Sequence, residues 1–214
     1  MKRSYRIFVL ALLMTGLFQT GCNDFLTEEV YTQYSPGNFL QNEEGIRKVL
    51  IGAYGRLQVN NGMREDQFTL SEFPTDITLE SGGQFEKDAL PFINFEWDAS
   101  STFLLNIWTP MYVAIRNANV LLGNIDNVSS ISEAKIASYK AEATFIRAEA
   151  YAHLYRYFGP VPLVLSTETD NLQPAKPSDE EFVRFVAEEL EKAARDLPLE
   201  QDQYGKATKG TALG

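Results

Sequence analysis

The chain has 214 residues and a formal net charge of −10, and 44% of its residues are hydrophobic. This composition excludes a disordered or fibrous protein, and the acidic balance argues against electrostatic binding of nucleic acid. One Cys and one His exclude an intrachain disulfide, a cysteine-based zinc site and a multi-histidine centre. We choose no metal-ligating residues and expect no cofactor, and calcium binding stays open.

Residues 1–21 have the features of an export signal. Basic side chains within the first six residues precede an apolar run over 7–18, which is shorter than the roughly 20 residues of a membrane-spanning helix. The single cysteine, Cys22, follows small residues, and the segment resembles a bacterial lipoprotein signal, although Gln19 stands where leucine is usual. We therefore expect lipidation at Cys22. An ordinary signal with a chance cysteine, or an anchor that stays attached, are the alternatives.

Removal of this signal makes the chain more acidic. It holds three basic and no acidic residues, so 16 basic residues remain against 29 acidic ones, a net charge of −13. Such a surface would be repelled by an anionic membrane. Attachment through acyl chains on a cysteine is the mechanism consistent with this charge.

The next segment, 22–41, contains Pro36 and Gly37 and few periodic apolar positions, and we interpret it as a tether. Asn42 is placed to cap a helix over 43–59, because the following apolar residues recur at helical spacing. Those residues are Ile46, Val49, Leu50, Ala53, Tyr54 and Leu57.

Residues 60–99 break the helical pattern. Glycines and prolines punctuate the segment, and we expect a long irregular stretch with short strands, for instance around 68–70. The stretch is rich in aromatic and acidic side chains, and long loops of this kind often carry function.

Three further helices are expected in the second half of the chain. One begins at Ser100 or Ser101 and ends near Ile125, with Pro110 near its start, and one capped by Ser132 ends near Phe158. The last is capped by Ser178 or Asp179 and ends at 197–198, and its face of Phe182, Val186 and Leu190 is expected to be exposed unless a further helix covers it. A weak internal repeat favours an all-α fold of tetratricopeptide-like helical hairpins with long irregular insertions, an α/α superhelix.

Four segments together resemble the SusD/RagB family of bacterial nutrient-binding lipoproteins. They run in order along the chain, and the most specific contains Ala141-Glu142-Ala143-Thr144-Phe145-Ile146-Arg147-Ala148 and ends in Gly159-Pro160-Val161-Pro162. The segments are 22–26, 107–119, 141–163 and 207–212. The chain is shorter than a typical member of that family, so we expect 42–214 to be the N-terminal part of a helical-repeat nutrient-binding domain whose C-terminal part is missing.

The resemblance implies a lipid-anchored protein of the outer membrane of a Gram-negative bacterium, usually facing the cell surface. The implied partner is a TonB-dependent transporter of the SusC type, and the implied ligand is a glycan, an oligosaccharide or another nutrient. Binding and delivery without chemistry are implied, so we do not expect an enzyme.

A glycan site needs exposed aromatic rings beside hydrogen-bonding groups. The mixture occurs in 94–98, and we choose Asn94, Trp97 and Asp98 as candidate ligand-binding residues, together with Asp76 from the same irregular segment. Alternatively, Phe92, Phe95 and Trp97 fill a core beneath the loop and the acids are merely solvated.

The other polar candidates are interpreted as structural. His153 lacks a catalytic partner at a recognisable spacing, and Arg147 and Glu142 are expected to bond to each other or to neighbouring backbone. The acidic helix face of Glu188, Glu189 and Glu191 is expected to be solvated.

Two other functions remain open at this stage. One is a helical-repeat envelope scaffold lipoprotein without glycan binding. The other is a secreted glycan hydrolase, since such enzymes need only a pair of carboxylates.

Overall fold

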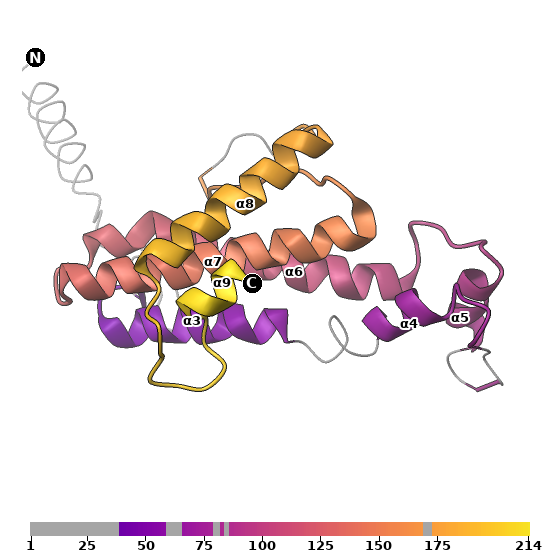
Figure 1. Ribbon diagram of the computed structural model, residues 1–214, viewed down its shortest axis with the longest axis horizontal. Helices are drawn as coiled ribbons and strands as arrows, with labels where there is room; N and C mark the ends of the chain where they lie inside the picture. The colour runs from indigo at the N-terminus through magenta and orange to yellow at the C-terminus, as the bar shows by residue number, and fades with distance from the viewer. Residues whose placement is uncertain (1–38, 59–65, 79–81, 84–85, 169–172) are drawn as a thin grey trace, which may run out of the picture. The chain divides into compact units, whose positions relative to one another are not determined.

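The computed structural model describes residues 39–58, 66–78, 82–83, 86–168 and 173–214. The signal, Cys22 and most of the expected tether lie outside these residues. Within the described ranges every regular element is a helix, and no strand occurs, which confirms the all-α class (Figure 1). The elements are α3 (Glu43–Leu57), α4 (Asp66–Glu72), α5 (Glu86–Ile93), α6 (Thr102–Asn124), the 3₁₀ helix η3 (Ile125–Asn127), α7 (Glu133–Phe158), α8 (Asp179–Asp196) and α9 (Lys209–Leu213).

Helix α3 begins where the sequence predicts. The Asn42 side chain accepts a hydrogen bond from the Gly45 N–H at 3.0 Å, which satisfies one of the free donors of the first turn. A Cβ on Gly45 would lie 1.8 Å from the Phe39 carbonyl oxygen, so only glycine fits there. Leu40 is buried in the core, and the packed unit therefore begins before residue 42.

The segment 60–99 is more regular than the sequence suggests. The strand expected around 68–70 is wrong, because these residues belong to α4, and α5 follows. Leu70 and Phe73, at helical spacing, pack against a small core formed by Ala89, Phe92 and Phe103. This burial of apolar side chains against α5 and the start of α6 explains why the segment is helical.

Helices α6 and α7 form a helical hairpin, with η3 in the connection. The Ser132 hydroxyl accepts from the Lys135 N–H and begins α7, and Gly159, with a φ of 64°, ends it. A left-handed residue at this place favours glycine. Pro110 is buried in the interior of α6 and not in its first turn.

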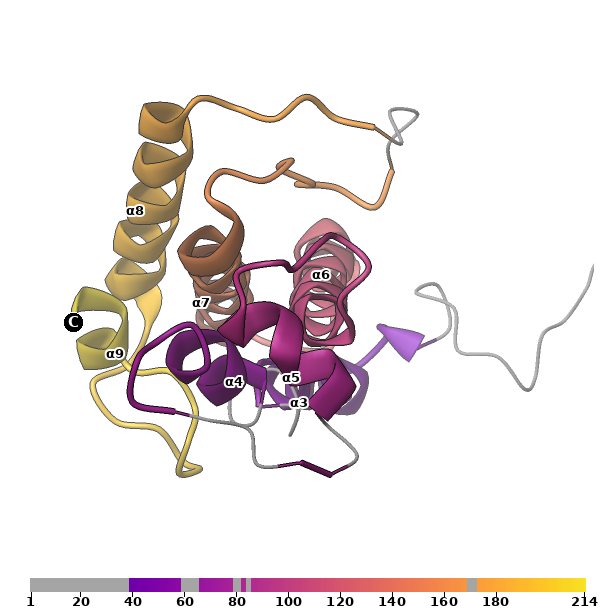
Figure 2. The ribbon, with the colours of Figure 1, turned by 90° about the vertical axis from the view of Figure 1, so that its right-hand side faces the viewer.

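Helix α7 is the centre of the packed unit. It contacts α3, α6 and α8, while α9 packs on α8, so the helices form successive layers around it (Figure 2). Small side chains on α7, among them Ala143, Ala148 and Ala150, are fully buried, which lets neighbouring helices approach closely.

Helix α8 is docked through its aromatic face. Its Ser178 forms a capping box with Glu181. Phe182 is fully buried, and its ring stacks on Tyr155 at 5.4 Å and meets Tyr151 edge-on at 5.9 Å. The expectation that Phe182 is exposed is therefore wrong, because α7 supplies the covering rings.

A buried ion pair joins α7 to α8. The Arg147 guanidinium donates through Nε, at 2.8 Å, and through Nη2 to Glu189 Oε2, and both side chains are about nine-tenths buried. Its Nη1 donates to Asn119 Oδ1 of α6 at 2.8 Å. The expectation that Glu189 is solvated is wrong. Arg147 bonds to α8, to α6 and to the Leu165 carbonyl at 3.5 Å, and not to Glu142.

The same network fixes the extended chain after α7. Asn119 Nδ2 donates to the Val164 carbonyl at 2.7 Å, and the Tyr151 hydroxyl accepts from the Val164 N–H at 2.6 Å. The Tyr112 hydroxyl donates to the Pro162 carbonyl at 2.9 Å. Partly buried backbone groups of this extended segment therefore find side-chain partners.

Replacing Arg147 with Met should destabilise the fold strongly. The variant leaves the Glu189 carboxylate buried without its partner, and breaking a buried pair costs about 3–5 kcal/mol. Chemical denaturation should show this loss of unfolding free energy, whereas R116M on the exposed side of α6 should show little change. The double variant R147M/E189M should recover most of the loss; equal stability of R147M and the wild type would contradict the assignment.

Candidate functional site

An exposed tryptophan rests on a buried phenylalanine at the end of α5. The Trp97 and Phe92 rings are stacked, with centroids 5.6 Å apart and planes 9° apart, and Phe95 lies 5.7 Å from Trp97. Phe92 is 2% exposed, whereas Trp97 is 44% and Phe95 66% exposed. One face of the indole is therefore supported by the core, and much of the remainder is open to solvent.

The backbone that presents Trp97 is a Schellman turn. The Glu96 N–H donates to the Pro91 carbonyl at 2.7 Å, and the Phe95 N–H donates to the Phe92 carbonyl at 3.4 Å. The turn places Phe95 at a φ of 59°, a left-handed conformation that costs a residue with a side chain about 1 kcal/mol. Strained non-glycine residues of this kind cluster at binding sites.

A hollow of about 200 Å³ opens beside the indole. Asp98 lies on its wall and accepts hydrogen bonds from the Ser100 hydroxyl at 2.6 Å and the Ser100 N–H at 2.8 Å. These bonds hold the pKa of Asp98 below its usual range, so the carboxylate is an acceptor and not a proton donor. The lining residues are Lys87, Asp88, Pro91, Glu96, Trp97, Asp98, Ser100, Ser101 and Thr102.

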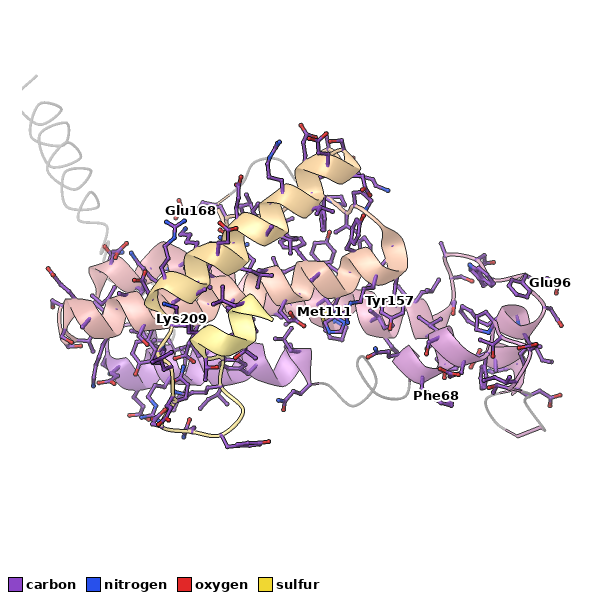
Figure 3. The ribbon with its side chains drawn as sticks, in the orientation of Figure 1. Phe68, Glu96, Met111, Tyr157, Glu168 and Lys209 are labelled. Carbon is purple, nitrogen blue, oxygen red and sulfur yellow. The ribbon has the colours of Figure 1, made fainter. Side chains whose placement is uncertain are left out.

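The structure brings together two of the four residues chosen from the sequence. Trp97 and Asp98 line the same hollow, whereas Asn94 is exposed at the end of α5 and does not line it. Asp76 is exposed in the turn after α4 and is also not among the lining residues. Figure 3 shows aromatic side chains gathered around this part of the chain, near the labelled Glu96.

The α5 positions that line the hollow are additions that the sequence did not single out. Lys87 and Asp88 reach the hollow from the first turn of α5, a helix that the sequence pattern did not predict. Of the three aromatic residues that the alternative placed in a core, only Phe92 is buried. The positive φ of Phe95 depends on the turn and is invisible in the sequence.

Two buried titratable residues of α7 lie close to other polar side chains of the fold. His153 is buried in α7 with Nε2 3.6 Å from Glu149 Oε1, and burial lowers its pKa. Burial raises the pKa of Glu142, which accepts a hydrogen bond from the Tyr54 hydroxyl at 3.1 Å. In the described part of the chain no cluster of His, Cys, Asp and Glu is arranged to hold a metal ion, and no helix is long and apolar enough to cross a membrane.

A family model described as starch-binding and associating with the outer membrane, SusD-like, matches residues 24–214. Two curated relatives match at similar identity. SusD-like protein P25 of Formosa agariphila is 28% identical over 168 residues, which are 73% of this chain and 30% of the relative. A SusD-like protein of Bacteroides ovatus is 25% identical over 228 residues, covering 98% of this chain and 39% of the relative. The chain thus spans well under half the length of either relative.

Solved structures share the fold. A SusD-like protein of Bacteroides fragilis matches with a TM-score of 0.69 and 24% identity, over 81% of this chain and 34% of the other. A laminarin-binding SusD-like protein matches with a TM-score of 0.69 and 23% identity, over 80% and 38%. A protein solved with xylogluco-oligosaccharide matches with a TM-score of 0.65 and 24% identity, over 78% and 32%. These likenesses confirm the helical architecture.

The strain at Phe95 has a measurable consequence. We expect F95G to be more stable than F95A by about 1 kcal/mol, because both variants lose the ring but only glycine relieves the left-handed backbone. Thermal or denaturant unfolding of the two variants measures the difference. An F95A variant as stable as F95G would show that the turn carries no strain.

Proposed function

The chain belongs to the SusD-like family, and on that premise we propose that it binds a glycan at the Trp97 hollow and delivers it to a transporter without catalysis. The SusD-like family consists of non-catalytic binding proteins, and its description associates it with the outer membrane. Relatives of the same fold are described with laminarin and with a xylogluco-oligosaccharide. Soluble β-glucans are therefore the first ligands to test.

The exposed indole of Trp97, seated on a buried ring, is the observation that carries this proposal. Aromatic faces stack on the apolar faces of sugars, and Trp97 is already held in place by Phe92, so little side-chain freedom is lost on binding. The ionised Asp98 beside it accepts hydrogen bonds from sugar hydroxyls. Asn94 and Asp76 are proposed to contact a longer glycan outside the hollow.

The proposed partner is a TonB-dependent transporter of the SusC type. The helices α3, α6, α7 and α8 share one hydrophobic core and offer a packed surface for docking, while the Trp97 hollow is formed by α5, the loop that follows and the first residue of α6. Such a division leaves the glycan site open while the helical array is engaged. Lipid attached to Cys22 would hold the protein at the outer membrane, facing the cell surface.

Replacing Trp97 with Ala should weaken glycan binding about fivefold or more, since stacking of an aromatic ring contributes about 1 kcal/mol or more. Affinity electrophoresis and calorimetry with laminarin and xyloglucan oligosaccharides measure the change. The control is F68A, which removes another exposed ring, on α4, and should leave binding unchanged. Undiminished binding by W97A would overturn this assignment of the site, and absence of saturable binding by the wild type would favour an envelope scaffold.

Replacing Cys22 with Ser should release the protein from membranes, because the acylated thiol is lost. Fractionation of cells and labelling with a tagged fatty acid test this expectation. The variant Q19L, which restores the usual leucine of the signal, should stay lipidated and is the control. Membrane attachment of C22S equal to that of the wild type would contradict lipidation at this residue.

A further inference from the structure

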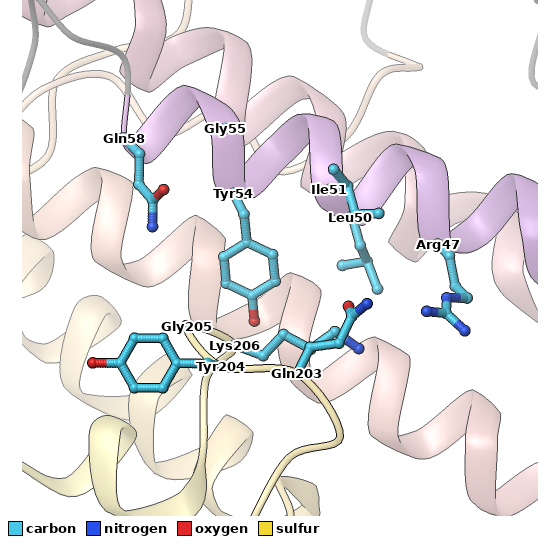
Figure 4. A pocket seen from close by; sticks show the side chains of 10 residues that line it. All are labelled: Arg47, Leu50, Ile51, Tyr54, Gly55, Gln58, Gln203, Tyr204, Gly205 and Lys206. Atoms are coloured by element: carbon cyan, nitrogen blue, oxygen red, sulfur yellow. The ribbon is translucent and has the colours of Figure 1, made fainter.

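A second and larger hollow lies between α3 and the loop that joins α8 to α9. Its volume is about 490 Å³, within the usual range of small-molecule sites. Figure 4 shows the side chains of Arg47, Tyr54 and Gln58 extending from α3 toward the loop. The lining residues are Arg47, Leu50, Ile51, Tyr54, Gly55, Gln58, Gln203, Tyr204, Gly205 and Lys206.

The loop side of this hollow is held in one conformation. The Gln201 side-chain amide donates to the Ala207 carbonyl at 2.6 Å, and the Lys209 N–H donates to the Pro198 carbonyl at 2.9 Å. The Tyr54 hydroxyl accepts from the Ala207 N–H at 3.0 Å and so ties the loop to α3. A wall fixed before binding lowers the entropic cost of taking up a ligand.

The two charged side chains that line the hollow are both basic, although the protein is acidic. Arg47 and Lys206 line the hollow, and no acidic residue is among the lining residues. Lys206 lies 3.1 Å from Asp202 and 4.0 Å from the buried Glu142, so much of its charge is balanced. Arg47 makes no ion pair or hydrogen bond within the described residues, although it interacts electrostatically with Glu43, Glu142 and Asp202. Its N–H groups can bind a carboxylate through two parallel hydrogen bonds.

The remaining walls offer groups that suit a sugar. The Tyr204 ring is fully exposed and Ile51 is 57% exposed, and the amides of Gln58 and Gln203 can donate to and accept from hydroxyls. Arg47 and Gln58 are eleven residues apart on α3, so the hollow extends about 16 Å along the helix. That length accommodates an oligosaccharide with one of its carboxylates at the Arg47 end.

We propose that this hollow is a second binding site, specific for a carboxylate-bearing oligosaccharide such as a uronate oligomer. Arg47 would bind the carboxylate, Tyr204 would stack on a sugar face, and the two glutamines would bind hydroxyls. A recess of this size and mixed polarity favours a small acidic glycan over an acidic protein partner, which would need a larger surface. No residue of this site belongs to the Trp97 hollow, so the two sites are independent.

The test uses a galacturonate tetramer and its fully methyl-esterified form, which share one skeleton and differ in charge. Titration calorimetry with the whole chain should show at least tenfold tighter binding of the acid form. R47Q should lose about tenfold affinity for the acid form and little for the ester, whereas Y204A should weaken both. Equal affinity for the two forms, absence of binding by either, or unchanged binding by R47Q would overturn the proposal.

Three controls test the specificity of this second site. R56Q removes the same charge from an exposed position of α3 that does not line the hollow, and an equal loss in R56Q would indicate unspecific charge attraction and overturn the site. Laminarin oligosaccharide, the neutral ligand tested at the Trp97 hollow, should not displace the acid tetramer, which keeps this test distinct from the Trp97 hollow. Displacement of the tetramer by tetraglutamate at equal concentration would assign the hollow to acidic peptides. That result would overturn the proposal that its ligand is an oligosaccharide.

Discussion

The arrangement of the helices depends on one buried guanidinium. Arg147 joins α7 to Glu189 of α8 and to Asn119 of α6, and Asn119 in turn holds the Val164 carbonyl in the extended segment. A buried charge is tolerable only when its partners satisfy it, so each of these elements must take the position that completes the network. Apolar packing along α7 supplies the burial, and the network selects which arrangement of the helices is adopted.

The segment between α3 and α6 lies outside the hydrogen-bond network of Arg147, Glu189 and Asn119. Helices α4 and α5 have a separate small core around Ala89, Phe92 and Phe103. This core supports the Trp97 ring, which stacks on Phe92. Trp97 is therefore both firmly seated and open to solvent, a combination that a fully packed helical face does not allow. The loop between α8 and α9 is also exposed and held in place, but by hydrogen bonds instead of a small core. These bonds join the loop to Tyr54 and link residues within the loop, and they fix it beside α3.

Features that depend on local interactions, such as helix caps, could be predicted from the sequence. Features that depend on a contact with an element distant in sequence could not. The caps at Asn42, Ser132 and Ser178 were predictable because each bonds to a residue three positions later, and the all-α class follows from the helical spacing of apolar residues. The pairing of Glu189 was not, since its partner lies 42 residues away. Trp97 could be chosen for its chemistry, but only the placement of α5 reveals that it is exposed while Phe92 fills the core.

The glycan site proposed at Trp97 can be tested most directly by observing the indole itself. The chain has two tryptophans, and Trp108 packs against Tyr112 and Phe158 in the helical core, so two indole N–H resonances can be assigned by NMR. Titration with laminarin or xyloglucan oligosaccharide should shift the Trp97 resonance saturably and leave the Trp108 resonance in place. Binding that leaves the Trp97 resonance unchanged would contradict the site.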